Sequence, residues 1–134
     1  MTIQVLKDIQ EQIQYQQNRL KFYNEQQEFI APLQALMDEV EGSLSVSTYT
    51  VDLTVTGGMG KLYGLIERLG ELGYTTGKEL PENTETYWFA RFEGVNQDVP
   101  YPTVYLSYSN NQCHRVKIGT EMKEVDVYEV RCHE

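Results

Sequence analysis

A glycine-rich turn between an expected strand and an expected helix is the first segment whose residues could perform chemistry. It contains Gly57, Gly58 and Gly60, followed by Lys61, and a glycine loop before a helix can wrap phosphate groups with its N–H groups. A Walker-type loop needs four residues between its glycines and a Ser or Thr after the lysine, whereas here the spacing is shorter and Leu62 follows. We therefore predict a tight turn with positive φ at the glycines and a solvated Lys61. Weak binding of an anion such as a nucleotide is the alternative.

Two Cys-His pairs offer the ligand types that zinc prefers. Cys113 precedes His114, and Cys132 precedes His133. Zinc requires four such ligands that converge on one point, but adjacent residues of a strand point to opposite faces. These four residues are therefore weak metal ligands, and we predict no metal and no cofactor.

The pairing of the last two expected strands decides the state of the cysteines. One register places Val116 opposite Val130 and joins apolar with apolar side chains. The other register places Cys113 directly opposite Cys132, so that the two could form a disulfide, but it sets Val116 against Glu129. The apolar pattern favours the first register and two buried free thiols, although a β-bulge would change the pairing.

No nucleophile and base stand at a spacing that indicates catalysis, so we predict a protein that is not an enzyme. Aromatic residues are more conspicuous, because the chain has 10 tyrosines. A group on neighbouring expected strands could form a contact surface, since Tyr and Trp dominate interface hot spots; the alternative is a sheet whose second face is partly aromatic. The group consists of Trp88, Arg91, Tyr101, Tyr105 and Tyr108.

The charge of the chain limits its partners. The 134 residues carry a formal net charge of −9, from 20 acidic and 11 basic residues. This charge repels phosphate backbones, so it disfavours nucleic-acid binding without excluding it. Solubility is the simpler role of the charge, and mimicry of nucleic-acid charge is the alternative. No apolar run is long enough to span a membrane and the N-terminus lacks a signal-peptide pattern, so we expect a cytoplasmic protein.

Residues 3–30 have the heptad pattern of one long helix, with apolar residues alternating at three and four positions. This pattern predicts either pairing with a second helix, most simply in a homo-oligomer, or packing along the chain's own sheet. We expect Pro32 to interrupt the helix, because proline lacks an N–H group. The seam consists of Leu6, Ile9, Ile13, Leu20, Tyr23 and Ile30, with glutamine at two further positions.

The remaining pattern predicts an α+β fold with a mostly antiparallel sheet and helices on one face. We expect residues 1–42 to form a kinked helical segment for oligomerisation or packing, and residues 43–134 to form the α+β domain. Residues 86–92 are apolar at both parities, which predicts a central strand that is covered either on both faces or on one face and by a partner on the other. The other expected elements are a strand over 44–56, a helix over 59–73, and strands over 103–109, 113–119 and 125–132.

The C-terminal segment resembles a family of small uncharacterised phage and prophage proteins. Its residues fit the pattern C-x-R-V-x-x-G-T-x(4)-V-x-x-Y-E-x-x-C over residues 113–132. The resemblance implies a phage-like origin, and therefore a place in the host cytoplasm. The family has no assigned activity, so no functional residue is carried over. The matching residues are Cys113, Arg115, Val116, Gly119, Thr120, Val125, Tyr128, Glu129 and Cys132.

These patterns together favour a binding protein without catalytic activity. Its most concrete form is a phage-type effector that self-associates through residues 3–30 and inhibits a host or defence-system macromolecule. One alternative is an oligomeric module that sequesters a small anionic ligand near Gly57–Lys61. The second alternative is an accessory protein that binds single-stranded nucleic acid through an aromatic sheet.

Overall fold

The computed structural model describes residues 2–82, 86–111, 113–120 and 126–132. A five-stranded sheet in the order β1-β2-β5-β4-β3 forms the body, and a separate hairpin, β6–β7, follows it. Every pair in the five-stranded sheet is antiparallel except β2–β5, which confirms the expected α+β class with a mostly antiparallel sheet. The strands are β1 (Ser43–Val46), β2 (Thr50–Gly57), β3 (Tyr74–Thr75), β4 (Tyr87–Gly94), β5 (Thr103–Asn110), β6 (Cys113–Thr120) and β7 (Asp126–Cys132).

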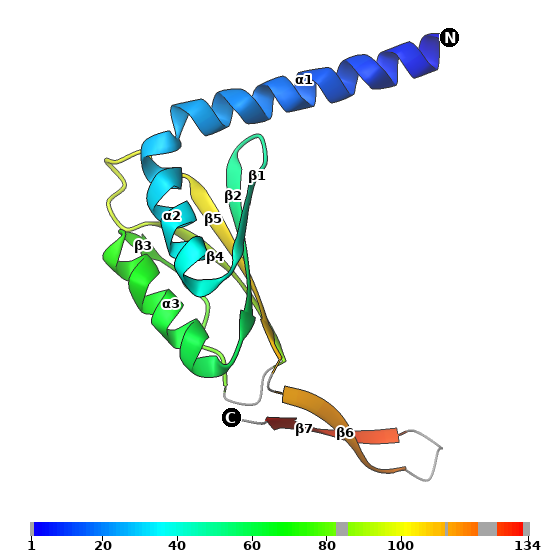
Figure 1. Ribbon diagram of the computed structural model, residues 1–134, viewed down its shortest axis with the longest axis vertical. Helices are drawn as coiled ribbons and strands as arrows, with labels where there is room; N and C mark the ends of the chain where they lie inside the picture. Colours follow the sequence, from blue (N-terminus) through cyan, green and yellow to red (C-terminus); the bar gives the residue numbers. More distant parts are fainter. Residues whose placement is uncertain (1, 83–85, 112, 121–125, 133–134) are drawn as a thin grey trace.

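Two helices, α2 (Gln27–Val40) and α3 (Met59–Glu71), cover one face of the sheet (Figure 1). Their apolar residues recur at helical spacing, and residues such as Leu33 and Leu62 are fully buried against the sheet. The core therefore lies between two layers, and α2 belongs to the same core as the strands that follow it. The predicted division at residue 42 therefore does not separate two independently packed parts of the chain, because residues on both sides of it share one hydrophobic core.

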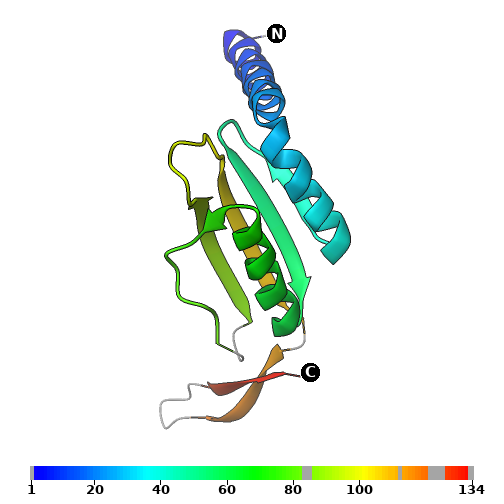
Figure 2. The same ribbon diagram turned by 90° about the vertical axis from the view of Figure 1, so that its left-hand side faces the viewer.

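The other face of the sheet is open. Burial alternates along β4 and β5, as a strand with one covered face requires, and the helices lie on the opposite side of the sheet (Figure 2). Of the two alternatives predicted for residues 86–92, coverage on both faces by the chain itself was therefore wrong, and a partner on the second face stays a prediction. We call this surface the open face; it consists of Ser43, Ser45, Asp52, Thr54, Thr56, Tyr87, Phe89, Arg91, Tyr105, Ser107 and Ser109.

The first helix, α1 (Ile3–Glu25), extends away from the body (Figure 1). Thr2 caps it by accepting a 3.2 Å hydrogen bond from the N–H of Val5. It ends at Gln26, whose carbonyl accepts hydrogen bonds from the N–H groups of Phe29 and Ile30 and so starts α2. The break expected at Pro32 therefore lies at Gln26, and Pro32 is inside α2.

Residues 44–56 form two strands where the sequence predicted one. The chain reverses after β1, and the Ser47 hydroxyl accepts hydrogen bonds from the N–H groups of Tyr49 and Thr50. These side-chain bonds replace ladder bonds and produce a local turn. As a result Tyr49, which has the same parity as the buried Val51 and Leu53, is 73% exposed.

The β6–β7 hairpin has a register that corrects the sequence prediction. Cys113 pairs with Cys132 and Val116 with Glu129, and the register then shifts by one residue between Lys117 and Gly119. Cys132 is disulfide-bonded, and the chain has only two cysteines. The prediction of free thiols was therefore wrong, because the bulge allows one register at the cysteine end and another beyond it.

Candidate functional site

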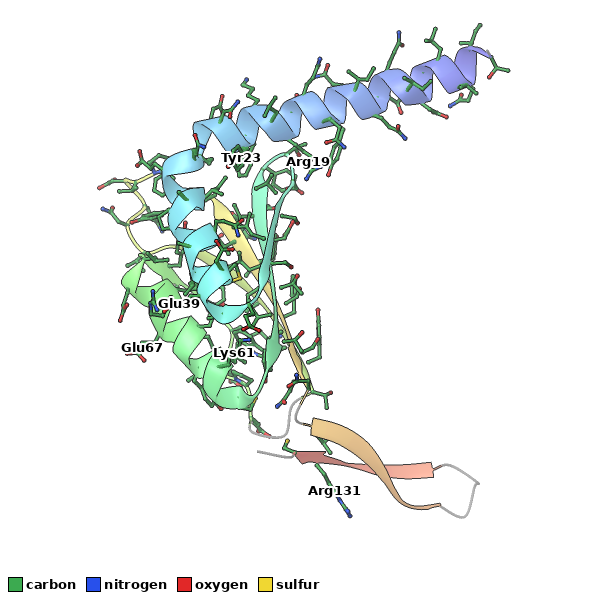
Figure 3. All side chains as sticks on the ribbon, in the orientation of Figure 1. Arg19, Tyr23, Glu39, Lys61, Glu67 and Arg131 are labelled. Carbon is green, nitrogen blue, oxygen red and sulfur yellow. The ribbon has the colours of Figure 1, made fainter. Side chains whose placement is uncertain are left out.

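Lys61, in the glycine-rich turn (labelled in Figure 3), already has a hydrogen-bond partner within the chain. Its ammonium group donates a 3.1 Å hydrogen bond to the carbonyl of Thr56. The neighbouring carbonyl, that of Gly57, accepts a 2.8 Å bond from the hydroxyl of Tyr108. Both carbonyls at the end of β2 therefore have internal partners, and a phosphate would have to compete with one of them for Lys61.

The glycines of this turn do not take positive φ, contrary to the prediction. Among the described glycines, positive φ occurs at Gly73, with φ of 101°. Gly58 is extended and serves as the N-cap of α3. A Cβ added at Gly57 would lie 2.6 Å from Cδ of Lys61, so the lysine side chain would have to shift to accommodate it. The turn therefore brings the lysine stem against Gly57, and its glycines lack the positive φ that we predicted.

The structure divides the expected aromatic contact surface into three places. Trp88 and Tyr108 are 2% and 0% exposed on the covered face, so their assignment to a contact surface was wrong. Arg91 and Tyr105 are cross-strand neighbours on the open face. Tyr101 precedes β5 and packs against the rings of Phe29 in α2 and Tyr74 in β3.

A different aromatic cluster lies on the open face. The rings of Phe89 and Tyr105 stack with centroids 5.5 Å apart and planes 15° apart. Tyr87, two residues before Phe89 and on the same face, is 58% exposed. The alternation of exposed and buried residues along β4 would have located this cluster, but large aromatic residues at both parities hid that signal. The cluster is an exposed apolar surface of the kind that protein partners cover.

The charges of the open face do not suit a nucleic-acid backbone. Arg91 forms a 2.6 Å ion pair with Glu93, so its charge is compensated. Asp52 lies at the level of Tyr105 and Arg91 across the sheet, and partial burial raises the pKa of its carboxyl group. Stacking proteins for single strands combine aromatic rings with an excess of basic groups, and the described residues of this face lack that excess.

Replacing Asp52 by asparagine is expected to stabilise the protein at pH 7 and to have no effect at low pH. A raised pKa means that the folded protein binds this proton more tightly than the unfolded chain does. Ionisation therefore reduces stability above the raised pKa, and this loss disappears below the unfolded pKa of about 3.9. Urea unfolding of D52N and wild type at both pH values measures the difference, with D98N in an exposed loop as control. A lower unfolding midpoint for D52N at pH 7 would contradict the expectation.

Helix α1 exposes almost its whole predicted seam. None of its residues is buried, and Leu6, Ile9, Ile13 and Leu20 are between 40% and 60% exposed. Tyr23, nearer the body, is 37% exposed. A hollow of about 970 Å³ runs between side chains of α1 alone, so the described residues provide only one of its walls.

The last predicted seam residue, Ile30, lies elsewhere. It belongs to α2, is 2% exposed and is part of the hydrophobic core. The bend at Gln26 turns it away from the direction of the other seam residues. Its assignment to an oligomer seam was therefore wrong, and the exposed stripe ends with Tyr23.

The weak zinc candidates do not form a metal site in the part of the chain that is described. Cys132 is in a disulfide and has no thiolate to offer a metal. Cys113 and His114 are placed only by the backbone register of β6, and His133 lies outside the described residues. Within the described ranges no group of three or more His, Cys, Asp and Glu residues could hold a metal ion.

Comparison with known proteins gives no assignment. Neither models of protein families, nor curated proteins, nor solved structures show a match to this chain. Of the helices described, none combines the length and apolar character that crossing a bilayer demands. The function therefore has to be argued from the two exposed apolar surfaces, α1 and the open face.

Proposed function

We propose that this chain is a binding protein without catalytic activity, which self-associates through α1 and presents its open face to a macromolecular partner. The observation that carries the proposal is the apolar stripe of α1, exposed along a helix of 23 residues in which nothing is buried. Helices in proteins gain most of their stability from packing of an apolar face and not from intrinsic propensity, and α1 buries no residue in such packing. A second helix on the stripe would supply that packing.

The charge of α1 favours a second copy of the chain as the occupant. The helix contains three acidic and three basic residues, so its net charge is zero, whereas the whole chain carries −9. Three of the positions that flank the stripe are uncharged glutamines, Gln10, Gln12 and Gln17. Two copies can therefore meet along α1 without the repulsion that their acidic bodies would otherwise cause.

The partner surface follows from the arrangement of the elements. Both α1 and the β6–β7 hairpin extend toward the side on which the open face lies (Figure 1), so a partner on that face would meet all three. The stacked rings of Phe89 and Tyr105 would supply the apolar centre of the contact. The resemblance of residues 113–132 to phage proteins makes a host or defence-system macromolecule the class of partner that we favour, and inhibition the effect.

Replacing Ile13 by aspartate is expected to convert an oligomer into monomers. A charge in the middle of an apolar seam would lose its hydration when two helices pair, so the dissociation constant should rise at least a hundredfold. Sedimentation velocity over a range of protein concentrations measures this, and native mass spectrometry gives the subunit number. Tyr15→Asp is the matched control, because Tyr15 is exposed to a similar extent on another side of the same helix, 47% against 52%.

Two results would contradict the proposal. If the wild-type chain is monomeric at every concentration, it does not self-associate. If Ile13→Asp and Tyr15→Asp have equal effects on the dissociation constant, the apolar stripe is not the surface through which the chains associate. The partner surface is tested with the same proteins as bait. Tyr63, on α3 at the other face of the sheet, is the control because it is 37% exposed, against 40% for Phe89. A host protein retained by wild type and by Tyr63→Ser, but not by Phe89→Ser, would support the open face as its docking surface.

A further inference from the structure

A small hollow of about 180 Å³ lies where the first turns of α2 meet the end of α3 and the loop before β5. These segments run side by side in both views of the ribbon (Figures 1 and 2). The hollow belongs neither to the stripe of α1 nor to the open face. Its lining consists of Glu28, Phe29, Pro32, Leu72, Tyr74 and Tyr101.

Three aromatic rings form the wall of the hollow. The Tyr101 ring lies between the other two, with its centroid 4.9 Å from that of Phe29 and 5.2 Å from that of Tyr74. The plane of the Tyr101 ring makes an angle of 54° with that of Phe29 and 66° with that of Tyr74, so neither pair is stacked in parallel. Ring faces carry the negative part of the aromatic quadrupole and attract cations.

The position of Tyr101 is built into the backbone around it. A Cβ added at Gly73 would lie 2.6 Å from the Tyr101 hydroxyl oxygen, and one added at Gly94 would overlap Cδ2 of its ring. Two glycines therefore leave the space in which this ring lies. The Tyr101 ring is therefore held in one position by the backbone around it, and it forms a fixed part of the hollow's lining.

One polar atom among the lining residues has no hydrogen-bond partner. The Tyr74 hydroxyl, which can both donate and accept, is buried in a residue that is 4% exposed, and it has no partner among the described residues. The Glu28 carboxylate adds a negative charge, and the described lining contains no lysine or arginine.

We propose that this hollow is a binding site for an alkylammonium group. Aromatic rings, a carboxylate and a buried hydroxyl that can accept a hydrogen bond are together the complement of an N–H-bearing organic cation. Burial and the neighbouring Tyr101 raise the pKa of Tyr74 to about 12, so its hydroxyl stays neutral at pH 7 and can accept from the ligand. The ligand is either a free amine or a lysine side chain of a partner protein, since both present the same chemistry.

Binding of n-butylammonium to the full chain, followed by NMR titration, tests the proposal, with 1-butanol as the neutral analogue. We expect a dissociation constant in the millimolar range for so small a ligand and at least tenfold weaker binding of the alcohol. Glu28→Gln should weaken binding of the amine about tenfold and leave the alcohol unchanged. Glu41→Gln, which removes the same charge beyond the other end of α2, is the matched control and should change little.

Tyr74→Phe provides a second variant that keeps the fold. It removes a buried hydroxyl without a partner, so stability should be unchanged or higher, while amine binding should fall at least threefold. Equal binding of amine and alcohol, or no effect of Glu28→Gln and Tyr74→Phe, would overturn the proposal. The Ile13→Asp variant should bind the amine as wild type does, because Ile13 does not line the hollow. The proposal of an amine site and the proposal of self-association are therefore tested separately.

A third arm distinguishes the two sources of the cation. Nα-acetyl-lysine methylamide carries the same butylammonium group on a peptide backbone. Binding of this compound at least as tight as that of n-butylammonium would identify a partner's lysine as the ligand. Binding of the free amine alone would identify a small-molecule amine, and binding of neither would overturn the proposal.

Discussion

Replacing Ile30 by alanine is expected to lower the free energy of unfolding by about 2–4 kcal/mol, whereas the same change at Ile13 should cost a monomer almost nothing. Ile30 is 2% exposed and lies in the core with Leu33 and Met37, so truncation leaves a cavity there. Ile13 is 52% exposed on α1, where truncation changes little in the folded chain. Both residues occupy the same heptad seam in the sequence, so the pair isolates the effect of the bend at Gln26.

Chemical denaturation at several protein concentrations checks this expectation. The loss caused by Ile30→Ala should be independent of concentration, because the contacts of Ile30 lie within one chain. Any loss caused by Ile13→Ala should appear only at concentrations where the chain associates. Similar concentration-independent losses for the two variants would mean that Ile13 packs on the chain's own body, whereas in the structure α1 contacts the body near its C-terminal end, through Arg19 and Phe22.

The bend at Gln26 shows why the sequence could predict the helices but not the division of their residues between surface and core. Heptad spacing continues without a break from Tyr23 to Ile30, so periodicity alone predicts one straight seam. Pro32 is a stronger helix breaker than Gln26, yet it lies on the exposed side of α2 and leaves the helix intact. The direction of the chain is determined by how α2 packs on the sheet, which is a tertiary property.

The same limit applies to the two surfaces that we regard as functional. Along β4, large aromatic residues at both parities indicated coverage on both faces without saying whether the chain or a partner supplies it. In the structure the even-numbered residues Trp88, Ala90 and Phe92 are buried, whereas Tyr87 and Phe89 are exposed. The hollow beside Tyr101 could not be predicted at all, because its rings come from α2, β3 and the loop before β5. Phe29, Tyr74 and Tyr101 are so far apart in the sequence that no local pattern relates them to one another.

Replacing Gly94 by alanine is expected to lower the free energy of unfolding by roughly 1–3 kcal/mol, as overpacking of an interior does. The added Cβ would overlap the Tyr101 ring at Cδ2 and lie 2.8 Å from Tyr101 Cβ. Overlap so near the backbone cannot be relieved by rotating the ring alone, so the loop before β5 has to move. At Gly64, in α3, an added Cβ meets nothing within 4 Å, and Gly64→Ala should therefore stabilise the protein by about 0.5–1 kcal/mol.

A double-mutant cycle assigns the loss at Gly94 to its contact with Tyr101. Tyr101→Ala by itself removes the ring contacts with Phe29 and Tyr74, but it also removes the atoms that an added Cβ would strike. The double variant should therefore lose about 0.5–3 kcal/mol less than the sum of the single losses. Additive losses would mean that Gly94 acts through its pairing with Tyr74 in the sheet and not through the ring. If the coupling is found, Gly94→Ala should also weaken n-butylammonium binding without altering self-association, because it displaces the central ring of the hollow and leaves α1 untouched.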